Sequence, residues 1–348
     1  MLYAVVEWNY ILSDLAKGPN VWSTNFPTCG GTRNSPINLL SAGPGFVRTR
    51  AVPWVLNNWN GDNSWKVKDE HYTVKFSLES GQAMSTSGGG LGTVYDIVQF
   101  HFHWGADNSI GSEHLLNGRS FPMEIHFVHK NSRYATIGDA VASGASDALA
   151  AIGFFFQIQA QDNPQLNAII NAVQVVRQDS DFEVSGVKVR VTDFVTSAFK
   201  SSYYRYFGGL TTPGCQEIVL WTVFTEPIGI SARQMQILRT QANMSFGVNF
   251  FRAVQPLGSR LVQLFETQPA RRNRVCQDLT ALSLDLAACL FLNDPSMLTS
   301  VCCIFQSELF YYKSLRLKVN NTIYACATES STNQVLRVDN SNNINNMT

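Results

Sequence analysis

The sequence lacks an excess of charge of either sign. Its 348 residues include 26 Lys and Arg and 26 Asp and Glu, and charged residues make up only 15% of the chain. A balanced and weakly charged chain gives no reason to expect a nucleic-acid partner or a basic membrane-binding face. We therefore expect no nucleic acid among its partners.

The sequence also lacks a long hydrophobic run. Its most apolar stretch, residues 279–305, is interrupted by Asp285, Asn293, Asp294 and Pro295, which leaves fewer than the roughly 18 uninterrupted apolar residues that a membrane helix needs. The N-terminal segment has no basic region before its apolar residues and does not resemble a secretory signal.

Cysteine is scarce in the body of the chain. Of seven cysteines, only Cys29 and Cys215 precede residue 276. An odd number with most members late in the chain is weak evidence for disulfides. Two buried free thiols fit these positions equally well, so the residues alone leave both interpretations open.

Apolar residues are plentiful, at 45% of the chain, and from about residue 53 to 262 they fall in short segments bounded by turns. These segments are YTVKFSL, VYDIVQFHFHW, MEIHFVHK, AIGFFFQIQ, VKVRVTDF and EIVLWTVF. Runs of this length and composition predict a β-rich core. Helical spacing occurs over residues 163–176 and 230–242, the second beginning at Ser231 as an N-cap.

Two of these segments carry a histidine pattern. In VQFHFHW, residues 98–104, alternation along a strand places His101 and His103 on one face. A single strand histidine is more often a hydrogen-bonded core residue, but two on one face favour a metal site. In MEIHFVHK, Glu124, His126 and Val128 share a face. If the two segments pair in an antiparallel sheet, His126 completes a cluster of three imidazoles.

Three neutral nitrogens without a fourth protein ligand are typical of catalytic zinc, which keeps one position open for water. Zinc lowers the pKa of that water to about 7, so a hydroxide nucleophile is available at neutral pH. Ligating histidines also need partners that fix their tautomers. Gln99 and Glu124 lie two residues from His101 and His126 on the same faces and suit this role.

Five motifs in order then carry a family resemblance: SPIN (35–38), QFHFHWG, GSEH (111–114), MEIHFVH and GGLTTPGCQEIVLWTVFTEPI (208–228). Over residues 8–262 the chain resembles the α-class carbonic anhydrases. The resemblance implies one catalytic domain over residues 1–265, mainly β (α+β), built on a large, twisted, mostly antiparallel sheet with short peripheral helices. It also implies reversible hydration of carbon dioxide to bicarbonate and a proton by zinc-bound hydroxide.

The resemblance assigns roles to individual residues. It makes His101, His103 and His126 the zinc ligands. Thr211 would accept a hydrogen bond from the hydroxide and pass its own proton to Glu113, and His71 would carry protons out of the site. The phrase around His71 departs from the family, because Asp69 and Glu70 precede it. His114 resembles a structural histidine outside the site.

The resemblance also predicts a substrate pocket. Val128, Leu210 and Trp221 match its apolar wall, and Ala151 stands where the family often has valine. Thr212 is similar to the residue that contacts bicarbonate and sulfonamide inhibitors, and anions are expected to inhibit as well. Trp8, Tyr10 and Tyr206 are similar to the aromatic residues at the cavity rim.

Within the family, FPTCGGTRNSPIN and TTPGC are similar to the secreted and membrane-anchored vertebrate members. This likeness implies a disulfide between Cys29 and Cys215 and an extracellular or cell-surface location. Residues 266–348 are atypical. Their apolar part is followed by about forty polar residues that predict disorder and do not fit a lipid-anchor signal.

Two alternatives to the enzyme remain open from the sequence. Relatives exist that keep this fold and lose zinc and catalysis, so a catalytically inactive binding module is the first. A cupin-like metal protein or a lectin that uses the histidines differently is the second, but neither explains the LTTP and GSEH motifs. Metal analysis separates the enzyme from the inactive module.

Overall fold

The computed structural model describes residues 7–176, 182–240 and 246–267, together with the backbone of four strands between residues 315 and 346. The chain divides into two compact units, Met1–Gln268 and Pro269–Thr348. Each unit is described by itself.

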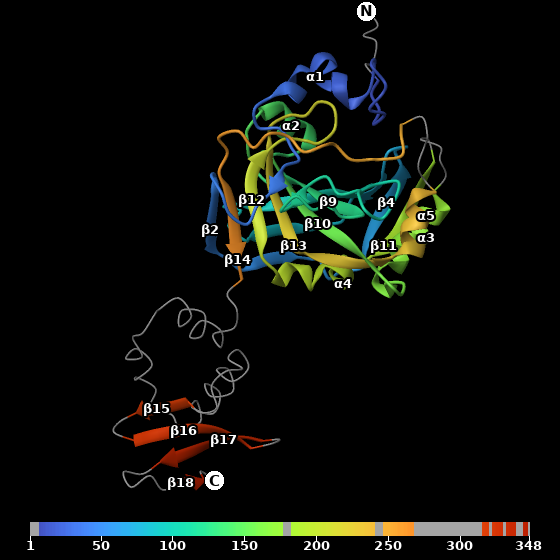
Figure 1. Ribbon diagram of the computed structural model, residues 1–348. Coiled ribbons are helices and arrows are strands. Elements are labelled where there is room, and N and C mark those ends of the chain that lie inside the picture. The colour runs from blue at the N-terminus through green and yellow to red at the C-terminus, as the bar shows by residue number, and fades with distance from the viewer. Residues whose placement is uncertain are drawn as a thin grey trace, which may run out of the picture. The chain divides into compact units, whose positions relative to one another are not determined.

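The first unit is built on one twelve-stranded sheet (Figure 1). Its strands are β2 (Phe46–Arg50), β3 (Trp54–Asn57), β4 (Asn63–Asp69), β5 (Val74–Leu78), β6 (Ser85–Gly88), β7 (Tyr95–Trp104), β9 (Met123–Asn131), β10 (Leu149–Gln159), β11 (Glu183–Val189), β12 (Tyr203–Gly208), β13 (Val219–Ser231) and β14 (Val262–Glu266). The order is β11-β4-β5-β7-β9-β10-β13-β12-β14-β2, and β6 pairs with β3 and β7. The β10–β13 and β14–β2 pairs are parallel and the other pairs of this sheet are antiparallel, which confirms the predicted fold class.

Short helices lie around the sheet. They are η1 (Pro19–Val21), α1 (Trp22–Asn25), η2 (Pro27–Gly30), α2 (Ile137–Ser143), η3 (Pro164–Leu166), α3 (Asn167–Val175), α4 (Thr192–Val195), η4 (Ala198–Lys200) and α5 (Ala232–Arg239). A small parallel pair, β1 (Asn38–Leu39) and β8 (Leu115–Leu116), completes the unit. Figure 1 shows α3 and α5 side by side at one end of the sheet, and these two helices contact each other.

Local sequence explains most of the helix positions. Ser231 caps α5 as predicted, because its hydroxyl accepts a hydrogen bond from the Gln234 N–H in a capping box. The segment VKVRVTDF departs from the prediction: its strand ends at Val189, and α4 follows. The apolar residues Phe194 and Val195 of α4 are buried, so their hydrophobicity reflects a short helix packed on the core rather than a longer strand.

The strands that carry the histidines are held by an aromatic core on their other face. Phe100 and Phe102 alternate with the histidines of β7, and both rings are buried. Phe127 of β9 lies directly opposite Phe100, and the two rings lie 5.2 Å apart. This packing fixes the two strands relative to each other on the face opposite the histidines.

The second unit contains one antiparallel sheet in the order β15 (Leu315–Val319), β16 (Thr322–Glu329), β17 (Thr332–Val338) and β18 (Ile344–Asn346). These strands fall within the stretch for which the sequence predicts disorder, and the prediction for residues 268–314 lies outside the described residues. Segments such as TIYACATE and TNQVLRV are rich in Thr, Val, Ile and Tyr, which favour strands even within a polar stretch.

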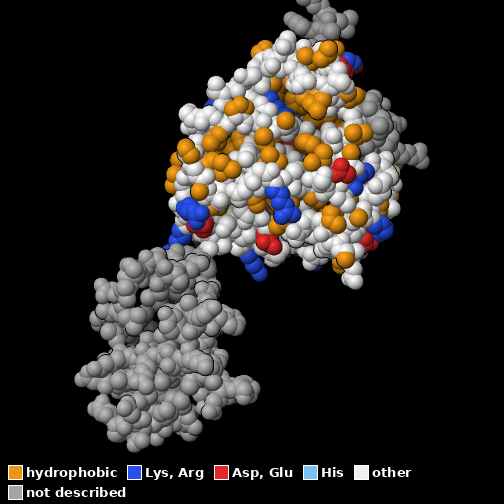
Figure 2. Space-filling model, in the orientation of Figure 1, with side chains coloured by type: hydrophobic (Ala, Val, Ile, Leu, Met, Phe, Trp, Pro, Cys, Tyr) orange, Lys and Arg blue, Asp and Glu red, His pale blue; other side chains and the backbone are white. Residues whose placement is uncertain are grey.

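The described surface carries few charged side chains, as the composition of the sequence predicts. Figure 2 shows a few small groups of Lys, Arg, Asp and Glu side chains, several with both signs side by side, among uncharged and hydrophobic ones on the face drawn. Among the described residues, no helix is long and apolar enough to cross a membrane.

Candidate metal centre

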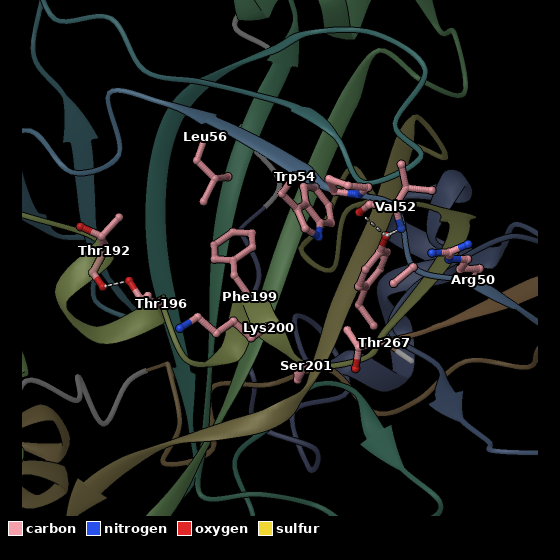
Figure 3. Close-up of a pocket in the computed structure, with 13 residues that line it drawn as sticks. Arg50, Val52, Trp54, Leu56, Thr192, Thr196, Phe199, Lys200, Ser201 and Thr267 are labelled. Atoms are coloured by element: carbon pink, nitrogen blue, oxygen red, sulfur yellow. Dashed lines mark hydrogen bonds between the residues drawn. The ribbon is translucent and has the colours of Figure 1, made fainter. Parts of the chain in front are cut away.

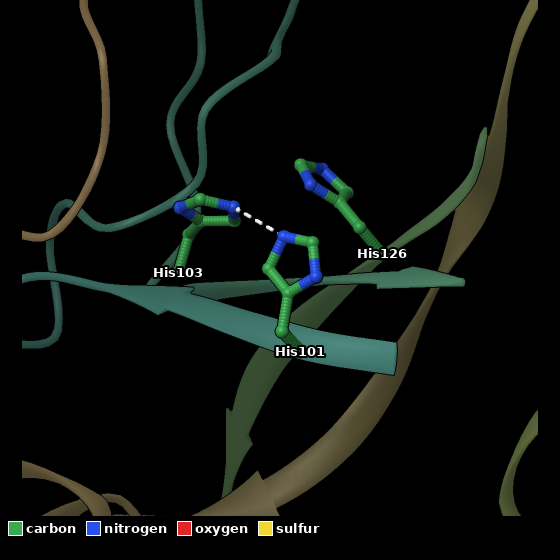
Figure 4. A group of neighbouring side chains, drawn as sticks. All are labelled: His101, His103 and His126. Carbon is green, nitrogen blue, oxygen red and sulfur yellow. Dashed lines mark hydrogen bonds between the residues drawn. The ribbon is translucent and has the colours of Figure 1, made fainter. Parts of the chain in front are cut away.

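The pairing of β7 with β9 brings three histidines together. In this antiparallel register His101 lies directly opposite His126, and His103 lies opposite Glu124. Figure 4 shows the three imidazoles projecting from the same side of the two strands toward a common point. Their ring centroids lie 4.7–5.4 Å apart. The pairing of β7 with β9 therefore forms the three-histidine cluster that the sequence predicts for a metal site.

One ring nitrogen of each histidine is held by a hydrogen-bond partner. His101 Nδ1 lies 2.9 Å from Gln99 Oε1, and His103 Nδ1 lies 2.9 Å from the carbonyl oxygen of Phe250. His126 Nε2 lies 2.6 Å from Glu124 Oε1. All three partners are acceptors, so these nitrogens carry the protons. The remaining nitrogens, Nε2 of His101 and His103 and Nδ1 of His126, are left with free lone pairs.

These free nitrogens face one another. Ligand atoms of the three histidines all lie within 4.8 Å of each other. The Nε2 atoms of His101 and His103 are only 3.1 Å apart, the contact marked in Figure 4. With both protons on Nδ1, this contact places two lone pairs face to face, which is repulsive without a cation between them. Three converging imidazole nitrogens fit zinc in its catalytic form.

Burial keeps the imidazoles neutral. Burial, together with His126, lowers the pKa of His103 to about 3. Burial also lowers the pKa of His101 and that of His126. Although Glu124 is buried too, the neighbouring His114 and His126 hold its pKa well below its usual range. At neutral pH the site thus offers three uncharged nitrogen ligands and one ionised carboxylate behind them.

Glu113 lies beside the histidines on the loop after β7. Its Oε1 accepts a 2.8 Å hydrogen bond from the Arg252 N–H. Its Oε2 is 3.4 Å from His103 Nε2 and 3.8 Å from His126 Nδ1. Burial raises the pKa of Glu113, and the Arg252 N–H and the Thr211 side chain oppose that rise. A buried carboxyl group and a buried threonine are therefore neighbours at the edge of the cluster.

A cavity of about 200 Å³ opens above the three histidines. Every predicted substrate-binding residue lines it: Val128, Ala151, Leu210, Thr212 and Trp221. Gln99 and Thr211 line it as well. Five aliphatic residues that the sequence did not indicate extend the apolar wall: Ile137, Val141, Leu149, Ala150 and Val219. The result is a small cavity with a polar floor and a largely apolar wall.

His71 and the three aromatic residues predicted at the rim, Trp8, Tyr10 and Tyr206, are not among the residues that line this cavity. His71 is not among its lining residues; its backbone is in the left-handed region, with φ of 67°, and its ring stacks on Phe246 at 5.7 Å. Trp8 packs against Tyr10, which is buried. Tyr206 is buried as well, and neither tyrosine expected at the rim lines the cavity.

Tyr206 belongs instead to a buried network beneath the histidines. Glu124 Oε1 lies 2.7 Å from His114 Nδ1, and His114 Nε2 lies 2.7 Å from the Tyr206 hydroxyl. Tyr206 in turn donates to Ser35 Oγ. His114, Glu124 and His126 also lie close enough to hold a metal. These hydrogen bonds already use both ring nitrogens of His114, so that group serves as a support for His126.

Two features of the site have only weak signals in the sequence. The Phe250 carbonyl that holds His103 comes from a loop 147 residues away, and any residue type supplies a carbonyl. Glu70 and Lys75 line the cavity and form an ion pair. Strand alternation predicts the position of Lys75 once β5 is known to pair with β7, but the sequence does not give that register.

A disulfide joins Cys29 of η2 to Cys215, which confirms the bond that the resemblance implies. Cys215 lies four residues after Thr211 in the loop between β12 and β13. The same loop is tied by Arg33, whose N–H donates to Glu217 Oε1. The N-terminal arm therefore braces the loop that supplies Thr211 and Thr212.

The chain is similar to known proteins of one family. The sequence profile of the eukaryotic-type carbonic anhydrases matches residues 17–266. Human carbonic anhydrase 7 is 34% identical over 267 residues, which are 74% of this chain and 96% of that protein. Rat carbonic anhydrase 4 is 33% identical over 74% of this chain and 81% of its own length. Human carbonic anhydrase 12 is 30% identical over 94% of this chain and 90% of its own length.

Proposed function

The chain belongs to the eukaryotic-type carbonic anhydrase family, and on that premise we propose that it is an active, zinc-dependent enzyme that interconverts carbon dioxide and bicarbonate. One observation carries the proposal. The three free imidazole nitrogens of His101, His103 and His126 converge beneath a small apolar cavity, each held by a partner on its other nitrogen.

The donor set suits zinc. Three neutral nitrogens without a fourth side-chain ligand leave a coordination position open, as in catalytic zinc sites. Zinc bound there would supply Lewis acidity and lower the pKa of a water ligand to about 7. The protein contributes the geometry: Gln99, Glu124 and the Phe250 carbonyl orient the rings before any ligand binds.

The wall of the cavity suits carbon dioxide. This molecule is small and has no charge, so an apolar surface holds it better than polar anchors do. Val128, Leu210 and Trp221 supply that surface beside His126, and the Trp221 ring lies 4.7 Å from the His126 ring. Thr212, on the same wall, is the proposed contact for bicarbonate and for sulfonamide or anion inhibitors.

Thr211 and Glu113 would orient the nucleophile. Thr211 would accept a hydrogen bond from the attacking oxygen and direct its own hydroxyl proton toward the Glu113 carboxyl group. Its burial at 6% exposure and the hydrogen bond that fixes Glu113 to the Arg252 N–H support this arrangement. A nucleophile held in this way presents a lone pair to the substrate carbon.

Each hydration event releases a proton that must leave the cavity. His71 remains our proposed carrier, although the structure puts its ring against Phe246 rather than on the cavity wall. Glu70 and Tyr72, on either side of His71 in the chain, do line the cavity, and burial raises the pKa of Tyr72 to about 12, which leaves Glu70 as the alternative carrier near neutral pH. A comparison of variants at His71 and Glu70 decides between them.

We also propose an extracellular or cell-surface location. The Cys29–Cys215 disulfide supports it, because such bonds persist in oxidising compartments.

The proposed catalytic function is tested by zinc analysis of the purified full chain together with stopped-flow hydration of carbon dioxide. One zinc per chain with hydration activity supports the enzyme, whereas a folded chain that binds no zinc, or a zinc-loaded chain without activity, supports the inactive binding module.

A further inference from the structure

A second cavity lies apart from the histidines. Its volume is about 560 Å³, within the roughly 300–1,000 Å³ typical of small-molecule pockets. It is formed by residues 50–56 around β2 and β3, by α4 and η4, and by Tyr203 of β12. None of the residues that line the metal-site cavity lines this one.

The walls of the second cavity are aromatic and aliphatic. Trp54 lies 5.6 Å from Phe199 and 5.1 Å from Tyr203, measured between ring centroids, and both pairs are edge-on. Leu56 continues the wall along β3 (Figure 3). Such a surface offers an apolar chain or ring system a large contact area. It does not by itself attract a charged molecule.

Two cationic side chains supply the attraction for charge. Arg50 and Lys200 line the cavity, and Figure 3 shows them on different sides of the space below Trp54. Within the described part of the chain, neither forms an ion pair, and no Asp or Glu lines the cavity. Glu266, opposite Arg50 in the β14–β2 pair, bonds to Arg48 at 2.9 Å instead.

A third cation lies behind the aromatic wall. The Arg205 guanidinium is 5.7 Å from the centre of the Trp54 ring and is 3% exposed. It donates to Thr222 Oγ1 and to the Gly89 carbonyl, which are uncharged acceptors. Among the described residues it has no carboxylate partner, so its charge adds to the positive potential of the pocket.

We propose that this cavity binds an amphipathic organic anion, with an apolar chain or ring system against Trp54 and Phe199 and a single carboxylate facing Arg50 or Lys200. The volume and the apolar walls of the cavity suit the apolar part of this ligand. The cations without an ion-pair partner suit its negative charge. The proposal is independent of the metal centre, since the two cavities share no residues.

The test uses the purified full chain and displacement of the fluorescent probe anilinonaphthalene sulfonate by decanoate. We expect saturable displacement, at least tenfold weaker displacement by decanol, and the same affinity with and without zinc. Probe displacement that requires zinc would place the site at the histidines and overturn the proposal. Equal displacement by decanol, or none by decanoate at millimolar concentration, would also overturn it.

Variants locate the site. Arg50→Gln and Lys200→Gln should each weaken decanoate binding about two- to fivefold, and the pair about tenfold, as expected for exposed charges. Arg119→Gln is the matched control, because Arg119 is an exposed arginine that forms no ion pair among the described residues and does not line the cavity. Leu56→Trp should fill the cavity and remove binding, with circular dichroism to verify folding. Unchanged affinity in the Arg50/Lys200 double variant contradicts the proposal.

Discussion

The Oε1 atom of Glu124 lies 2.6 Å from His126 Nε2 and 2.7 Å from His114 Nδ1, so one buried carboxylate holds two imidazoles. Its second oxygen accepts the His114 backbone N–H at 2.8 Å. Glu124 thereby fixes the proton of His126 on Nε2 and leaves Nδ1 free to face the other two histidines. The orientation of one proposed ligand depends on a residue that does not itself face the cavity.

Glu124→Gln should therefore weaken zinc binding without abolishing it. The amide oxygen is uncharged and a poorer acceptor for two histidines, so we expect about a 10- to 100-fold loss of affinity, measured by competition with a chelator. Glu183→Gln, an exposed glutamate on β11, is the control and should bind zinc normally. Equal affinities in the two variants would show that Glu124 does not support His126.

Removal of the disulfide tests whether it holds the loop that carries Thr211 in place. The Cys29–Cys215 bond closes a long loop, with a sequence separation of 186. Its loss in a Cys29→Ser/Cys215→Ser variant should lower the free energy of unfolding by about 2–5 kcal/mol in urea titrations. We also expect reduced hydration activity under conditions where the variant is fully folded. Full activity there would contradict a role for the bond in holding Thr211.

His129 should contribute to sensitivity to acid. It lies on the face of β9 opposite His126, where Nδ1 donates to the Phe127 carbonyl and Nε2 faces Thr86 Oγ1. Burial lowers its pKa to about 4, against about 6.5 in an unfolded chain. The unfolded state therefore binds a proton first as the pH falls. Stability present above pH 6.5 should be lost progressively down to pH 4, by about 3 kcal/mol.

This contribution is measured as the difference between the parent and His129→Gln in chemical unfolding at several pH values. The variant lacks the titrating group, so the difference in unfolding free energy should shrink by about 3 kcal/mol between pH 7 and pH 4. A difference that stays constant over this range would show that His129 does not couple folding to pH. Asp96, the charged group that opposes the shift, is present in both proteins.

Proton removal is tested with His71→Ala and Glu70→Gln. If His71 carries the proton, its loss should slow turnover by up to roughly 10²-fold at low buffer concentration, leave zinc bound and be reversed by imidazole buffer. Glu70→Gln serves as the comparison, since Glu70 lines the cavity and pairs with Lys75. If turnover slows only in the Glu70 variant, Glu70 rather than His71 is the proton carrier.

Strand alternation predicted much of this molecule because it acts locally. It places His101 and His103 on one face and Phe100 and Phe102 on the other, and it puts Gln99 within reach of His101. The register that sets His126 opposite His101 depends on the pairing of two distant strands. The sequence supports that pairing only through the family resemblance.

Strand alternation could not predict the roles of residues that reach the site from distant parts of the chain. The Phe250 carbonyl reaches His103 from outside the sheet, and a backbone oxygen has no signature in the sequence. Tyr206 was expected at the cavity rim, yet its hydroxyl lies beneath the site between His114 and Ser35. Its position follows from the face that β12 turns toward the core, which depends on how β12 pairs with β13.

The central claim is that His101, His103 and His126 hold one catalytic zinc ion. It is tested most directly by measuring zinc content and carbon dioxide hydration on the same preparations of the parent, His126→Ala and His129→Gln. The account predicts about one zinc per chain with activity in the parent and in His129→Gln, and the loss of both in His126→Ala. Zinc retained with full activity in His126→Ala, or a folded parent that binds no zinc, would contradict it.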